Sequence, residues 1–172
     1  MRRAGRAILP LTLLLAGVGC GSASQNSTVP TLVSSALVHA AFVDRADRIC
    51  TQGRKRLILT GNRYFGNLPP NKDPSSAAVT AYSRQQAVPI LKHQYGRLRM
   101  LNPPPGDAAT IDRILNLAEL GIRQLEMDPT LLNRGNGIPP GLQRARLGAY
   151  RYGLGACGQQ IEVPTHGVQL GG

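Results

Sequence analysis

The chain has 172 residues and carries 20 Lys and Arg against 9 Asp and Glu, a formal net charge of +11. This length suits one domain with a single core, and the positive excess favours anionic partners such as lipid headgroups or phosphate-bearing wall polymers. Because the chain has no tryptophan and only two phenylalanines and five tyrosines, it lacks the grouped aromatic platforms of single-strand binders, and nucleic acid is not expected as a partner.

An export signal opens the chain. Arg2, Arg3 and Arg6 precede an apolar run over residues 7–18, and Cys20 follows. A basic start, a short apolar run and small residues are typical of a secretory signal. The cysteine that closes the run resembles a bacterial lipoprotein signal, in which Cys20 would be lipidated and become the new N-terminus. The run is about half as long as the roughly 20 residues of a bilayer-spanning helix, which disfavours an uncleaved anchor.

The signal leaves a second processing site open. Gly17 stands where the lipoprotein pattern usually has a leucine-like residue, and cleavage after Ala23 would instead release a secreted protein. We predict a signal over residues 1–19, and a lipidated cysteine with a polar, flexible tether over residues 20–34. The domain would then sit at the extracytoplasmic face of the cell membrane, anchored through its lipid.

The first periodic segment begins at Ser34 or Ser35 and ends near Phe65. Apolar and small residues recur along it at steps of three and four, which predicts an amphipathic helix. The expected buried stripe consists of Phe42, Ala46, Ile49, Gly53 and Leu57.

Four basic residues of this segment, Arg54, Lys55, Arg56 and Arg63, form the basic cluster. The three consecutive members cover about 200° of a helix, so they cannot all face the core. A solvated helix face explains such a cluster, and attraction to an anionic lipid or wall polymer is the functional interpretation.

The second segment covers residues 75–101, with Asp73 or Ser75 as the helix cap. Its stripe consists of Val88, Leu91, Tyr95 and Leu98. Pro89 lies inside the pattern and removes a backbone hydrogen bond, so we expect a kink or a split over residues 85–88.

The third segment covers residues 107–127, with Asp107 as the cap and a short turn after it. Its stripe consists of Ile111, Leu115, Ala118, Ile122 and Leu125.

The fourth segment covers residues 140–161 and offers two apolar faces. One face consists of Leu147, Tyr150, Leu154, Cys157 and Ile161, and the adjoining face of Leu142, Ala145, Ala149, Tyr152 and Ala156. Tyrosines on this segment and near Pro89 also suggest a ligand cavity between helices. Its candidate lining is Val88, Leu91, Tyr95, Tyr150 and Tyr152.

Cys50 and Cys157 remain once Cys20 is assigned to lipid. An exported pair in an oxidising compartment predicts a disulfide, which closes a loop of about 100 residues and contributes about 4–5 kcal/mol in the loop-entropy treatment. The alternative is two free thiols with a redox or metal role, but the chain has no C-x-x-C motif.

These segments predict an all-α fold. Four helices with short Pro-rich connections over residues 35–162 favour an up-down-up-down bundle, followed by a loose tail over residues 163–172. In that topology the first and fourth helices are neighbours, so the disulfide would join them.

Three short pieces carry a resemblance to a known group: residues 46–50 (ADRIC), 101–104 (LNPP) and 152–157 (YGLGAC). On these pieces the mature chain resembles small exported helical lipoproteins of high-GC Gram-positive bacteria. The resemblance implies a helical fold and an envelope location, and it adds no catalytic residue or cofactor.

Catalytic and metal-binding patterns are not found in the sequence. His39, His93 and His166 lie on separate segments, no Glu-x-x-His pair occurs, and no serine sits in a G-x-S-x-G turn. We therefore expect no metal, no cofactor and no enzymatic activity. The sequence favours an envelope-anchored binding or scaffold protein whose protein partner it does not specify, and a carrier of a small apolar ligand is the alternative.

Overall fold

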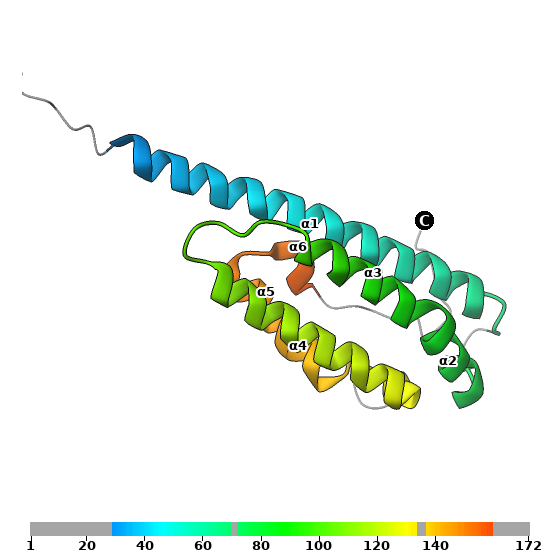
Figure 1. Ribbon diagram of the computed structural model, residues 1–172. Coiled ribbons are helices and arrows are strands. Elements are labelled where there is room, and N and C mark those ends of the chain that lie inside the picture. Colours follow the sequence, from blue (N-terminus) through cyan, green and yellow to red (C-terminus); the bar gives the residue numbers. More distant parts are fainter. Residues whose placement is uncertain (1–28, 70–71, 134–136, 160–172) are drawn as a thin grey trace, which may run out of the picture.

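The computed structural model describes residues 29–69, 72–133 and 137–159, and of residues 29–34 and 133 the backbone alone. The described residues are all-helical, without a strand (Figure 1). Their elements are α1 (Val29–Phe65), α2 (Ser76–Tyr82), the π-helical turn η1 (Ser83–Ala87), α3 (Val88–Arg99), α4 (Ala108–Met127), the 3-10 helix η2 (Pro129–Asn133), α5 (Pro140–Tyr152) and α6 (Gly155–Gly158). The predicted signal, Cys20 and the tail lie outside the described residues.

Helix α1 is the longest element, and the other helices lie on one side of it, with α3 and α6 packed against it (Figure 1). It begins at Val29, ahead of the predicted start at Ser34 or Ser35, and it ends at Phe65 as predicted. Its predicted stripe is confirmed, since every member is buried: Phe42, Ala46, Ile49, Gly53 and Leu57. Along the described chain, no helix combines the length and the hydropathy that a membrane crossing requires.

The second predicted segment forms α2, η1 and α3 in direct succession. The Ser75 hydroxyl caps α2 by accepting the Ala78 backbone N–H at 3.2 Å. The predicted disruption before Pro89 takes the form of the π turn η1. Because Pro89 has no N–H and its ring crowds the preceding turn, the helix widens there, and the Val88 N–H donates to the Ser83 carbonyl. The apolar stripe of α3 is buried as predicted.

Helices α4 and α5 lie against each other with glycines at their closest approach. A Cβ built on Gly141 would lie 2.4 Å from the Gly121 backbone nitrogen, and one built on Gly148 would lie 3.0 Å from Ile114 Cγ1. Residue numbers therefore rise along one helix as they fall along the other, so α4 and α5 are antiparallel. The predicted stripe of α4 is buried throughout.

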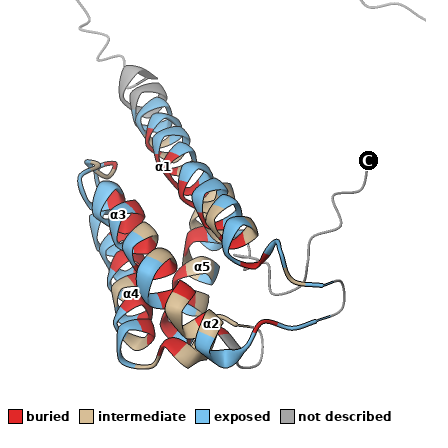
Figure 2. Cartoon of the chain, turned by 90° about the vertical axis from the view of Figure 1, so that its right-hand side faces the viewer, coloured by how far each residue is buried: buried red, intermediate tan, exposed pale blue. Residues whose placement is uncertain are grey.

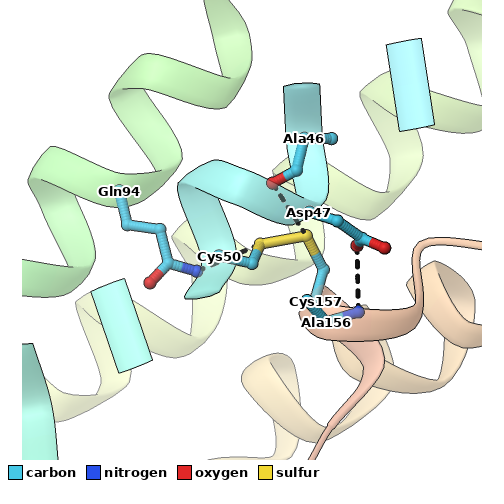
Figure 3. The surroundings of a disulfide bond; sticks show 6 residues. All are labelled: Ala46, Asp47, Cys50, Gln94, Ala156 and Cys157. Atoms are coloured by element: carbon cyan, nitrogen blue, oxygen red, sulfur yellow. Dashed lines mark hydrogen bonds between the residues drawn. A yellow bond between two sulfur atoms is a disulfide. The ribbon is translucent and has the colours of Figure 1, made fainter. Parts of the chain in front are cut away.

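The prediction of one continuous helix over residues 140–161 is wrong at its C-terminal end, because the helix ends at Tyr152. Gly153 adopts a left-handed conformation (φ 99°) that terminates α5, and the chain resumes in the short helix α6. The predicted Cys50–Cys157 disulfide is confirmed, with the two Cα atoms 5.1 Å apart. It joins α1 to α6 and not to the fourth long helix. Beside it, Asp47 Oδ1 accepts the Ala156 N–H at 2.9 Å (Figure 3).

The two predicted faces of α5 differ in burial. Leu142, Ala145 and Ala149 are buried, whereas Leu147 and Tyr150 are 45% and 70% exposed. The adjoining face thus forms the core, and Leu147 and Tyr150 of the other face are turned to solvent, because α4 covers α5 from the glycine side. Figure 2 shows buried residues on the inward sides of the helices and exposed residues outside.

Candidate binding surfaces

The structure divides the predicted basic cluster. Lys55, Arg56 and Arg63 are exposed on α1. Lys55 lies opposite the buried stripe, whereas Arg56 and Arg63 lie on its flank beside α3. Arg54 is half-buried on the other flank, where its guanidinium donates to Gln159 next to α6. Arg54 therefore contributes to the packing of the chain end, and the other three residues form the accessible part of the cluster.

Helix α3 extends the accessible basic surface. Arg56 and Arg97 line the shallow seam between α1 and α3, and Arg97 Nη1 donates to Gln52 Oε1 at 2.8 Å. Between described residues, the ion pairs that link Lys or Arg to a carboxylate are Lys92–Glu126 and Arg99–Glu119. The basic side chains on the outer face of α1 therefore have no carboxylate partner in the described chain.

The described residues do not assemble the predicted ligand cavity. Val88, Leu91 and Tyr95 are buried in the core, whereas Tyr150 points to solvent at 70% exposure. The internal space that Tyr95 lines is about 10 Å³, room for a single water. Burial raises the pKa of Tyr95 to about 12, as expected for a phenol in a dry interior. Core side chains thus fill the space that a ligand would need.

An open groove of about 480 Å³ runs between α4 and α5 on the surface. We call its apolar lining the floor, which consists of Ile114, Leu117, Leu147 and Gly148. We call its polar lining the rim, which consists of Thr110, Arg113, Arg144, Arg151 and Tyr152. Both helices contribute positions spaced i, i+3, i+4 and i+7, so each presents one continuous stripe to the groove.

Three arginines frame this groove. Arg113, Arg144 and Arg151 are exposed, and no hydrogen bond or ion pair links them to another described residue. The antiparallel register places Arg113 and Arg151 near the same end of the groove. Arg144 lies two helical turns away from Arg151, about 10 Å along α5. The groove therefore combines an apolar floor with unpaired positive charge.

A hydrogen-bonded triad lies at that end of the groove, where Tyr152 belongs to the lining. The Tyr152 hydroxyl donates to Asp107 Oδ2 at 2.6 Å, and His39 Nδ1 lies 3.3 Å from the same oxygen. These residues come from α5, the start of α4, and α1. Asp107 does not cap α4 with its side chain, contrary to the sequence prediction, because its carboxylate is engaged by the tyrosine and the histidine.

The triad shifts two pKa values. The hydrogen bond from Tyr152, followed by that with His39, lowers the pKa of Asp107 below its usual range. Burial, followed by the hydrogen bond to Asp107, raises the pKa of Tyr152. Asp107 thus stays ionised and Tyr152 stays protonated at neutral pH. The triad holds its three elements together, and it includes no serine or cysteine nucleophile.

The described residues contain no group of three or more His, Cys, Asp or Glu side chains placed to share a metal ion. Comparison with known proteins gives no match to a family model, a curated protein or a solved structure.

Sequence reasoning missed the groove and the triad. Arg144, Arg146 and Arg151 are recognisable as basic positions of the fourth segment, but Leu147 reads as a core residue. On α4 the groove residues Thr110, Arg113, Ile114 and Leu117 are spaced i, i+3, i+4 and i+7. This helical series combines an arginine with apolar residues, and it is the pattern from which the groove could have been predicted. No sequence signal pairs His39 with Asp107.

Proposed function

We propose that this chain is a non-enzymatic binding protein of the cell envelope, anchored through a lipid on Cys20 and attracted to anionic polymers or lipids by its basic cluster. One observation carries the proposal: Lys55, Arg56 and Arg63 are exposed together on α1 without a carboxylate partner in the described chain. Arg56 and Arg63 are seven residues apart, so they lie on one line along the helix.

The length of α1 limits how the cluster can meet a surface. Its 37 residues give a rod of about 55 Å, and Arg54 lies about 38 Å from the end at Val29. If α1 stood upright on a membrane, the cluster would face the wall and not the headgroups. If α1 lay flat, the cluster would face the headgroups. A lipid anchor and a basic patch together form a two-part membrane grip in the second case.

The proposal includes the up-down-up-down order of four principal helices, with α2 to α3 counted as one helix. The antiparallel contact of α4 with α5 supports this order. The disulfide between α1 and α6 supports a closed arrangement in which the last described helix returns to the first.

Co-sedimentation with vesicles tests the proposal. The full chain carrying Cys20→Ser, which cannot be acylated, is mixed with phosphatidylglycerol vesicles, phosphatidylcholine vesicles or isolated anionic wall polymer. Each basic group near an anionic surface contributes about 1 kcal/mol, so Lys55→Gln/Arg56→Gln/Arg63→Gln should weaken binding on the order of 100-fold. Added salt should weaken binding as well, because it shortens the Debye length.

A matched control separates the effect of the basic cluster on binding from the effect of the net charge of the chain. Lys72→Gln/Arg84→Gln/Arg123→Gln removes one lysine and two arginines that are exposed elsewhere, and it should bind nearly as well as the parent chain. Equal binding to neutral and anionic vesicles, together with no binding to wall polymer, would refute the proposal. An equal loss in both triple variants would assign the effect to overall charge.

A further inference from the structure

We infer that the groove between α4 and α5 binds a single-chain lipid with one anionic headgroup. This site lies apart from the basic cluster of α1, and the inference does not depend on the proposed function. It identifies a ligand class, an amphiphile with an acyl chain and a phosphate, from the groove's own side chains.

The floor suits an acyl chain. Ile114 and Leu117 from α4 and Leu147 from α5 form a continuous apolar strip, and Leu147 is 45% exposed. Gly148 has no side chain to raise the floor, and a Cβ there would already touch Ile114. The volume of about 480 Å³ falls in the usual range of small-ligand sites, about 300–1,000 Å³.

The rim suits a phosphate headgroup. Arg113 and Arg151 come from facing helices near the same end of the groove, and neither has a carboxylate partner among the described residues. Guanidinium groups bind phosphate through paired hydrogen bonds, and two of them on opposite walls can bind one headgroup from both sides. Arg144 adds a third positive charge further along. The nearby carboxylate of Asp107 is already engaged by Tyr152 and His39.

Charge complementarity selects this occupant over others. A purely apolar ligand would leave three arginines at the rim without a counterion. A free anion would leave the exposed Leu147 and the rest of the floor in water. One anionic group attached to one chain satisfies both features, and a groove bounded by only two helices suits one chain better than two.

Titration calorimetry on the full chain tests the inference. The probe is lysophosphatidic acid below its micelle concentration, with a neutral monoacylglycerol and inorganic phosphate as separate arms. We expect saturable binding of lysophosphatidic acid. The affinities of the other two probes should be lower by about tenfold or more, because the monoacylglycerol lacks the charge for the rim and phosphate lacks the chain for the floor.

Variants locate the site. Arg113→Gln/Arg144→Gln/Arg151→Gln should weaken lysophosphatidic acid binding by about tenfold or more, since it removes charge-assisted contacts. Arg45→Gln/Arg84→Gln/Arg123→Gln removes the same charge from exposed positions outside the groove and should leave binding within about twofold of the parent. Far-UV circular dichroism confirms that both proteins are folded.

A second pair of variants tests the floor without changing charge. Leu147→Asn should weaken the binding of lysophosphatidic acid. Leu120→Asn changes a comparably exposed leucine of α4 outside the groove, and it should leave this binding unchanged. Absence of lysophosphatidic acid binding, equal binding of phosphate alone, or equal losses in groove and control variants would overturn the inference. So would a concentration-dependent dimer that the Leu147→Asn change dissociates, because a second copy would then occupy the groove. Vesicle binding through Lys55, Arg56 and Arg63 is measured separately, so either idea can fail alone.

Discussion

Replacing Gly141 by alanine should destabilise the protein, although alanine is the better helix former. The added Cβ would lie 2.4 Å from the Gly121 nitrogen, 2.7 Å from its Cα and 2.8 Å from the Leu117 carbonyl oxygen. All three atoms belong to the backbone of α4, so no side chain can rotate away. Ordinary contact would require α4 and α5 to separate by about 1 Å, which weakens dispersion contacts along the whole pair.

The expected magnitude follows from two opposing terms. Overpacking of this kind costs about 1–3 kcal/mol, and occasionally more. The higher helix propensity of alanine returns at most about 1 kcal/mol. Because the clash is with backbone, we expect a cost at the upper end of this range, and after the propensity gain the free energy of unfolding should fall by about 1–2 kcal/mol.

Gly96→Ala is the matched control. Gly96 is an exposed residue of α3, and a Cβ there would meet nothing within 4 Å. It should raise the free energy of unfolding by about 0.5–1 kcal/mol through helix propensity alone. Urea unfolding followed by circular dichroism at constant m-value measures both changes. If Gly141→Ala were as stable as the parent or more stable, the close approach of α4 and α5 would be refuted.

Three further predictions follow from the described contacts. Cys50→Ala/Cys157→Ala should lower the free energy of unfolding by a few kcal/mol, up to about 4–5, because it opens a loop of 107 residues; a urea midpoint equal to that of the oxidised parent would contradict this. Ser83→Ala should raise it by about 1 kcal/mol, because the buried Ser83 hydroxyl has no hydrogen-bond partner in the described chain; thermal unfolding measures the change, and a loss of stability would show that the hydroxyl is satisfied. The lowered pKa of Asp107 means that its carboxylate stabilises the folded state above its ordinary pKa of 3.8, and this contribution is lost as pH falls through the lower folded value. The stability difference between the parent and Asp107→Asn should therefore shrink below about pH 4 in unfolding curves recorded at several pH values, and a difference independent of pH would contradict the triad.

Much of the fold follows from the sequence because burial on a helix repeats with the helical period. The stripes from Phe42 to Leu57 on α1 and from Ile111 to Leu125 on α4 consist of apolar and small residues at helical spacing, and both are buried. Pro89 predicts a break for a covalent reason, the missing N–H, and the π turn occurs there. The disulfide is predicted from the cysteine count and from the export that we expect, and neither requires knowledge of the geometry.

The rest depends on which faces meet in space. Gly153 ends α5, but the sequence offers Gly148 and Gly155 as equally good breakers, so the separate helix α6 could not be placed. Leu147 is apolar but exposed, because α4 approaches α5 along its glycine side. The triad joins residues from three elements, and only their packing brings those side chains together.

The proposed membrane attachment depends on a lipid at Cys20, and the intact mass of the protein shows whether that lipid is present. The protein is extracted with detergent from the envelope of the cells that make it, and its mass and N-terminal peptide are measured. We expect a chain that begins at Cys20 and carries covalent acyl groups, and Cys20→Ala should release the protein from membranes. A chain that begins at Ser24, or an unmodified Cys20, would contradict it.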